Sequence, residues 1–209
     1  ERPAWGPEGE LLHFGARSGG ARHLHRVAAG GGAVEPVTAG PRHLDGFSFS
    51  DDGSVLAYVA TDERSPTELY VARGDGTVAE QATAFNDELL EGRALSTAER
   101  ISWISEDSTE IEGWVMPPTS VRPDGGHPLV LSLRSDRFGA SGYDFRPLHQ
   151  ILAGAGFYVF FANPRGASGY GPDFQAAIRQ AWGMTERDDL AGGLDAVLER
   201  YPQAAPERV

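Results

Sequence analysis

The sequence predicts two β-propeller blades over residues 1–90, followed by an α/β region with a mainly parallel sheet over residues 91–209. Two observations predict this division. Short strand patterns recur with a period near 44 residues in the first region, a length typical of propeller blades. The second region alternates apolar runs of strand length with amphipathic helical patterns, as α/β folds do.

The repeat emerges when the sequence is aligned with itself. Residues 7–14 (PEGELLHF) align with residues 51–58 (DDGSVLAY) at an offset of 44, and residues 24–26 align with residues 69–71 at an offset of 45. A closed propeller typically needs four to eight blades. Either further blades precede Glu1, which we favour because an open array leaves sheet edges unpaired, or the strands form another small sheet.

Four histidines fall in this first region: His13, His23, His25 and His43. Their spacing does not match a zinc motif. We therefore expect them at solvated strand or loop positions.

A charged stretch, residues 87–99, breaks the strand pattern and is predicted to be a linker. Two short apolar runs, residues 101–105 and 111–116, then flank a polar turn, which predicts a β-hairpin. Pro117 and Pro118 end it.

The next three elements are a buried strand, a helix and a second buried strand. Residues 129–133 form the first strand. Asp144 is expected to cap a helix that ends at Gly156. The apolar residues at helical spacing, which predict its buried face, are Phe145, Leu148, Ile151, Leu152 and Ala155. Five apolar residues in a row, 157–161, predict a strand covered on both faces.

Two further helices follow. Pro172 is a typical first-turn proline, and Gly183 ends that helix. Thr185 and Asp188 have the spacing of a capping box at the start of the next helix. Gly192 and Gly193 would each cost that helix about 1 kcal/mol relative to Ala. A close approach to the sheet would explain them.

Composition excludes several classes of function. The formal charge of −12 argues against nucleic-acid binding and against docking on anionic membranes. All 18 basic residues are arginine, which excludes a Schiff-base or P-loop lysine. The chain has no cysteine, which excludes disulfides and a thiol nucleophile and fits a cytoplasmic setting.

Several segments resemble the prolyl oligopeptidase family of serine peptidases, and most closely its acylaminoacyl-peptidase and dipeptidyl-peptidase-like branch. They are residues 5–9 (WGPEG), 49–53 (FSDDG), 83–86 (TAFN), 110–117 (EIEGWVMP), 163–171 (NPRGASGYG), 182–183 (WG) and 188–190 (DDL). The resemblance covers nearly the whole chain. It implies a propeller that filters peptides by size and an α/β-hydrolase domain that cleaves them with a Ser-Asp-His triad, without metal or cofactor.

The nucleophile of α/β-hydrolases lies in Gly-x-Ser-x-Gly, which this sequence lacks. Ser141 and Ser168 do not fit that motif. The family pattern places the nucleophile just after a strand that would begin near Val209. We therefore expect an incomplete chain, with the last propeller blades and the N-terminal half of the hydrolase domain. The remainder of the same protein would then be a partner.

The oxyanion loop departs from the family, which has His-Gly-Gly-Pro after the first buried strand. Here the positions read Arg134, Ser135, Asp136 and Arg137. The backbone N–H groups of Ser135 or Asp136 could still donate to an oxyanion, whereas an inward carboxylate of Asp136 would repel it. Arg134 or Arg137 could neutralise that carboxylate, or the segment could be displaced.

The turn over residues 163–171 follows the second buried strand, where α/β folds face their ligands. It is either a plain connection or a wall of the site, with Asn163, Arg165 and Tyr170 as its polar residues. Arg165 could anchor the oxyanion loop or face the substrate entrance. We favour a role in holding the turn together.

The leading functional prediction is part of a serine peptidase that hydrolyses short peptides. The alternatives are a catalytically inactive protein of the same architecture that binds peptides or partners, and an esterase. The family resemblance and exposed strand edges also make homo-oligomers plausible.

Overall fold

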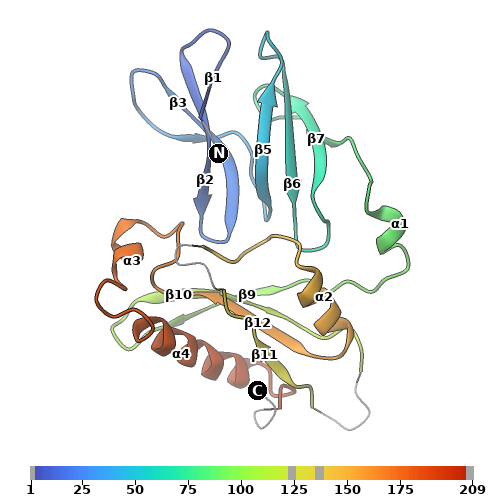
Figure 1. Ribbon diagram of the computed structural model, residues 1–209, viewed down its shortest axis with the longest axis vertical. Helices are drawn as coiled ribbons and strands as arrows, with labels where there is room; N and C mark the ends of the chain where they lie inside the picture. Colours follow the sequence, from blue (N-terminus) through green and yellow to red (C-terminus); the bar gives the residue numbers. More distant parts are fainter. Residues whose placement is uncertain (1–2, 122–125, 135–138, 206–209) are drawn as a thin grey trace. The chain divides into compact units, whose positions relative to one another are not determined.

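The computed structural model describes residues 3–121, 126–134 and 139–205. The chain divides into two compact units (Figure 1). The first comprises Glu1–Gly92 with Tyr143–Phe145, and the second comprises Arg93–Gly142 with Arg146–Val209. Within the described ranges, no helix has the length and apolar character needed to cross a membrane.

The first unit contains two successive antiparallel meanders of four strands each. The first meander consists of β1 (Ala4–Trp5), β2 (Leu11–Ser18), β3 (Ala21–Ala28) and β4 (Glu35–Pro36). The second consists of β5 (His43–Phe49), β6 (Val55–Thr61), β7 (Glu68–Arg73) and β8 (Glu80–Gln81). The two meanders are joined where Arg22 of β3 pairs in parallel with His43 of β5.

The strands follow the repeat in the sequence. β2 and β6 begin 44 residues apart, and β4 and β8 begin 45 residues apart. A shared apolar core links the meanders, because Leu24 of β3 belongs to one cluster with Leu44 of β5 and Leu56 of β6. The internal repeat is therefore a repeat of supersecondary structure.

The prediction of solvated histidines is wrong for three of the four. His13, His23 and His43 are buried, and desolvation lowers the pKa of each. They occupy inward-facing strand positions: the His13 ring packs 4.6 Å from the Phe49 ring. In the part of the chain that the structure describes, no three His, Asp or Glu side chains gather as a metal site.

A buried glutamate anchors the end of the first unit. Glu68, at the start of β7, is only 2% exposed. Its carboxylate accepts hydrogen bonds from the Thr83 hydroxyl, the Phe85 N–H, and both the backbone N–H and the side-chain amide of Asn86. These bonds fix the TAFN segment just before the short helix α1 (Asp87–Leu90).

The second unit is built on a four-stranded sheet in the order β11-β12-β10-β9. The strands are β9 (Glu99–Ile104), β10 (Glu110–Met116), β11 (Leu129–Leu131) and β12 (Tyr158–Asn163). β9 and β10 form the predicted hairpin, and all six residues of β12 are buried, as its apolar sequence predicted. Ala204 adds an isolated parallel bridge to His127, just before β11.

The prediction of a mainly parallel sheet is wrong for these strands. β11 and β12 are parallel, whereas β12 pairs antiparallel with β10, and β10 with β9. A short turn joins β9 to β10, and strands joined in this way must run antiparallel. The sheet is therefore mixed, and its parallel pair is the one joined through a helix.

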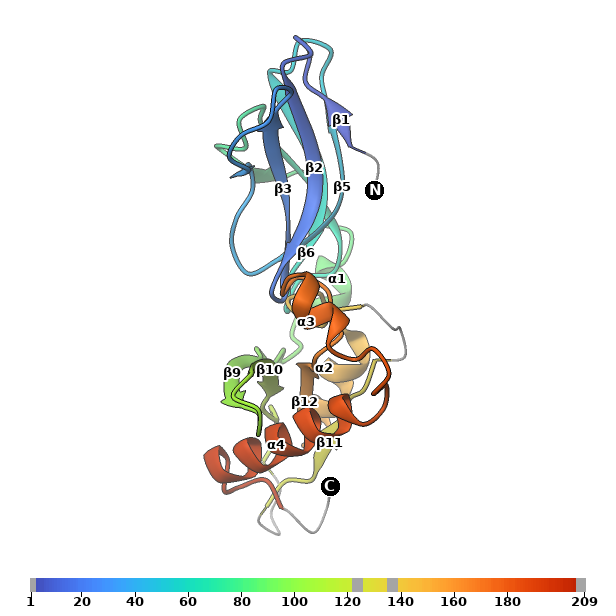
Figure 2. The same cartoon turned by 90° about the vertical axis from the view of Figure 1, so that its left-hand side faces the viewer.

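Two helices cover opposite faces of this sheet (Figure 2). Helix α4 (Thr185–Arg200) packs on the face that carries Trp103 and Phe160. Helix α2 (Pro147–Gly154) lies on the other face, where His149 contacts the ring of Phe161. Because successive residues of a strand point to opposite faces, Phe160 and Phe161 each serve one helix.

The predicted buried face of α2 is wrong. Leu148 and Ile151 are 63% and 67% exposed, whereas His149, Gln150 and Ala153 are buried. The polar residues turn inward because they have specific partners: the Gln150 amide exchanges two hydrogen bonds with the backbone of Ser96. The helix also begins at Pro147, without a side-chain cap from Asp144.

Helix α3 (Pro172–Ala176) begins at the predicted proline but ends at Ala176, well before the predicted end at Gly183, and Gln180 between them has a positive φ of 67°. The capping box at α4 does not form. Met184 is the N-cap, and the carboxylate of Glu186 instead accepts the N–H of Gly183.

The predicted close approach of α4 to the sheet is confirmed. A Cβ atom on Gly193 would lie 2.5 Å from Cζ2 of Trp103 and 2.7 Å from Cζ of Phe160. At Gly192 the corresponding nearest atom, Cδ1 of Trp103, is 3.4 Å away. Gly193 is therefore the residue that lets the helix seat on the aromatic core.

Candidate functional site

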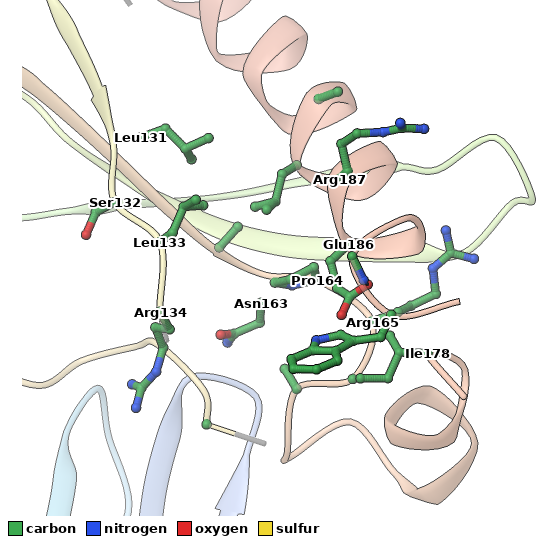
Figure 3. Close-up of a pocket in the computed structure, with 18 residues that line it drawn as sticks. Leu131, Ser132, Leu133, Arg134, Asn163, Pro164, Arg165, Ile178, Glu186 and Arg187 are labelled. Carbon is green, nitrogen blue, oxygen red and sulfur yellow. The ribbon is translucent and has the colours of Figure 1, made fainter. Parts of the chain in front are cut away.

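A cavity of about 530 Å³ opens in the second unit, where β11 and β12 end. Leu131, Leu133 and Arg134 extend along one wall, and Arg165, Ile178, Glu186 and Arg187 along the other, with Asn163 and Pro164 between them (Figure 3). The remaining lining residues are Ser132, Gly139, Ala162, Gly166, Ala167, Trp182, Gly183, Leu190 and Ala191. The lining is mainly apolar, with a few charged side chains, as in many ligand sites.

The turn over residues 163–171 contributes its first five residues, 163–167, to the lining of the cavity. Its glycines, Gly166, Gly169 and Gly171, have φ values of 98°, 95° and 92°, which L side chains rarely adopt. Gly166 also lies against Ile178, whose Cδ1 would be 2.6 Å from an added Cβ. The turn is thus a defined shape that its glycines make possible.

Asn163 links this turn to residues that follow β11. Its Oδ1 accepts the N–H of Ser141 at 2.6 Å, and its Nδ2 donates to the carbonyl of Ser141 at 2.9 Å. The same Nδ2 donates to the hydroxyl of Tyr170 at 2.7 Å. The three hydrogen bonds of the amide therefore join Ser141, Asn163 and Tyr170 on one side of the cavity.

Tyr170 continues this network. Its hydroxyl donates to the carboxylate of Glu112 on β10, which is also paired with Arg100. Burial, and then the bond to Glu112, raise the pKa of Tyr170 far above its usual value of 10.0. Tyr170 therefore stays protonated and acts as a hydrogen-bond donor.

Arg165 points to carboxylates of the second unit. Its Nη2 lies 2.7 Å from Oδ1 of Asp189 on α4, its Nε donates to the same carboxylate, and its Nη1 pairs with Asp107 in the β9–β10 turn. Nη2 also donates to Ser105 at 3.1 Å. The hydrogen bond to Asp189, and then the charges of Asp189 and Asp107, raise the pKa of Arg165 above its ordinary value. Its contacts are those of a brace between turn, helix and hairpin.

The sequence singled out Arg134, Ser135 and Asp136 as the oxyanion loop. Arg134 lines the cavity, and its Nη1 donates to the carbonyl of Ala140 at 2.6 Å. Ser135, Asp136 and Arg137 lie outside the described residues. Of the predicted site residues, the structure therefore places Arg134, Asn163 and Arg165 around one cavity, with Tyr170 bonded to Asn163 behind it.

Sequence reasoning missed two interactions here. The hydroxyl of Ser132 lies 2.9 Å from Nε2 of the buried His149, and no motif marks that pair. Asp189, the partner of Arg165, is fully buried. The segment Asp188-Asp189-Leu190 is one of the motifs of the family resemblance, but nothing in it indicates that Asp189 pairs with Arg165, 24 residues earlier.

Comparisons with known proteins show similarity to peptidases. A sequence model of the prolyl oligopeptidase family matches residues 143–209. An uncharacterized peptidase of Bacillus subtilis, YuxL, is 27% identical over 209 residues, which is 100% of this chain and 32% of that protein. Dipeptidyl aminopeptidase BIII of Pseudoxanthomonas mexicana is 27% identical over 171 residues, covering 78% of this chain and 24% of its own length.

Among solved structures, the acylaminoacyl peptidase of Pyrococcus horikoshii superposes with a TM-score of 0.83 at 25% identity, over 93% of this chain and 30% of that one. The chain thus spans about a third or less of the length of the proteins it matches. The chain is therefore similar to proteins of the prolyl oligopeptidase family, as its sequence motifs indicated.

Proposed function

We propose that this chain is part of a serine peptidase that hydrolyses short peptides through an acyl-enzyme, with its catalytic triad beyond Val209. In this proposal residues 1–90 are the last blades of a β-propeller, and residues 91–209 are the first half of an α/β-hydrolase domain. The observation that carries it is the cavity at the ends of β11 and β12, walled by the NPRGASGYG turn. Relatives named as peptidases support it.

The proposed reaction is peptide hydrolysis by a Ser-Asp-His triad. A serine outside this chain attacks the peptide carbonyl, a histidine takes its proton as general base, and an aspartate orients that histidine. The cavity wall contributes shape, and backbone N–H groups near Arg134, Ser135 and Asp136 are the candidates for stabilising the oxyanion. This scheme requires no metal or cofactor. A cytoplasmic setting and homo-oligomers belong to the same proposal.

Active-site labelling with a fluorophosphonate, followed by peptide mapping, tests the proposal together with chromogenic peptide substrates. We expect the parent protein to hydrolyse short peptides and to carry the label on a serine outside residues 1–209. The 209-residue chain alone should stay unlabelled and inactive. A label on Ser132, Ser141 or Ser168 would refute the location of the nucleophile.

The second candidate is a catalytically inactive protein that binds peptides or partners. The sequence Arg134-Ser135-Asp136-Arg137 favours it, because this segment replaces the glycine-rich loop on which an oxyanion site usually rests. It predicts saturable peptide binding in calorimetry without hydrolysis or labelling. The same two measurements therefore separate the candidates.

A further inference from the structure

We infer that Asn163 is a positioning residue: its side-chain amide holds the segment around Ser141 and so fixes one wall of the cavity. The inference deepens the proposed function, since that wall would face the substrate. The amide makes a two-point contact with one residue, accepting the Ser141 N–H at 2.6 Å and donating to the Ser141 carbonyl at 2.9 Å. A neighbouring strand would pair with the backbone in the same way.

Burial makes these two bonds matter. Asn163 is 1% exposed and Ser141 is 0% exposed, so in the folded protein the amide and not bulk water satisfies these backbone groups. Buried backbone N–H and C=O groups need partners, and losing the amide would leave two of them unpaired on one residue. The segment would then have to move to find other partners.

The bond between Asn163 and Tyr170 fixes the orientation of the amide. Asn163 Nδ2 also donates to the Tyr170 hydroxyl at 2.7 Å, and that hydroxyl in turn donates a hydrogen bond to the carboxylate of Glu112. Tyr170 can therefore act toward Asn163 as an acceptor, which requires the Nδ2 end of the amide to face it. Glu112 and Asn163 are directly opposite each other in the β10–β12 register, so a single tyrosine hydroxyl can bond to both side chains.

The same segment is held from the β11 side. Arg134 donates from Nη1 to the carbonyl of Ala140, the residue before Ser141, at 2.6 Å. Ser132, the residue after β11, stays paired with β12, because its N–H donates to the carbonyl of Phe160 at 2.8 Å. Residues 140–141 are thus tied to the ends of both parallel strands, and Gly139 beside them lines the cavity.

Amide hydrogen exchange of the peptide containing Ser141 tests the contact without any assay of activity. Asn163→Ala should accelerate exchange at Ser141 by about tenfold, because its hydrogen-bond acceptor is lost. Asn163→Asp keeps the size of the side chain and one acceptor oxygen but not the donor, so it should give a smaller increase. It also serves as the second variant if Asn163→Ala does not fold. Ser168→Ala, in the same turn, is the matched control and should leave this exchange unchanged.

Kinetics of the parent protein separate positioning from simple support of the fold. We expect Asn163→Ala to lower kcat for short peptides by about tenfold to a hundredfold, with a small change in KM. Unchanged exchange in a folded Asn163 variant would overturn the contact, and faster exchange with unchanged kcat would overturn the positioning role. If the unsubstituted protein hydrolyses no peptide, the proposed function fails, while the exchange measurement still decides whether Asn163 holds the segment.

Discussion

Replacing Gly193 by alanine should destabilise the second unit, although alanine is the better helix former. Alanine is less flexible than glycine in the unfolded chain, and this difference alone would stabilise α4 by about 1 kcal/mol. Against this, the new Cβ would lie 2.5 Å and 2.8 Å from two ring carbons of Trp103 and 2.7 Å from Cζ of Phe160. Contacts this short force the buried rings or the helix to move.

The size of the effect follows from these two contributions. Inserting a methyl group into a packed core typically costs about 1–3 kcal/mol. The net loss for Gly193→Ala is therefore about 0–2 kcal/mol in the free energy of unfolding. Trp103 has little room to retreat, because its Nε1 donates to the carbonyl of Asp189 on the same helix at 2.9 Å. Phe160 is fully buried in the sheet.

Gly192→Ala is the matched control. It lies on the same helix, one residue earlier, and its Cβ would make an ordinary contact of 3.4 Å with Trp103. We expect it to stabilise the protein by about 0.5–1 kcal/mol. Urea unfolding followed by circular dichroism, with hydrogen exchange of the α4 amides as a local measurement, gives both values. Equal stability of the two variants, or a more stable Gly193→Ala, would refute the close approach.

Three further predictions concern buried charge and protonation. Arg165→Ala should cost about 3–5 kcal/mol in unfolding experiments, because Asp189 would keep a buried carboxylate without its cation, and Asp189→Asn should recover part of that loss in a double-mutant cycle. The Thr83 hydroxyl and further donors hold the pKa of Glu68 below 4.5, so its carboxylate contributes stability above pH 4.5 that is lost as the pH falls through the lowered pKa. Melting temperatures between pH 3 and 7 should show the deficit of Glu68→Gln shrinking at low pH, and a constant deficit would contradict this. In an absorbance titration of the phenols, Tyr201 should ionise at a pKa of about 12, in a step that Tyr201→Phe removes, and Tyr170 should ionise later still.

Local signals in the sequence predicted the elements that depend on local chemistry. The 44-residue repeat placed β2 and β6, and the apolar run at residues 157–161 located a strand that is buried on both faces. The pair of glycines in α4 predicted the close approach of helix and sheet, which the contact at Gly193 confirms. The apolar run and the glycine pair are each contained in a few neighbouring residues, and the repeat is visible when the sequence is aligned with itself.

Features set by distant partners were not predictable. Gln150 turns the face of α2 inward because it bonds to Ser96, 54 residues earlier, and apolar spacing cannot reveal such a partner. The direction in which β12 pairs with β10 likewise depends on the path of the whole chain. The candidate site shows the same limit: the turn could be recognised, but its bonds to Ser141 and Asp189 join residues more than 20 positions apart.

The brace at Arg165 has a consequence for the order of folding. Its partners lie 58 residues before it, at Asp107, and 24 residues after it, at Asp189. The arginine can therefore complete its bonds only after the hairpin has formed and α4 has docked, and contacts of such long range are typically made late. Substitutions at Arg165 should then accelerate unfolding more than they slow folding, so that this single side chain governs the lifetime of the folded unit.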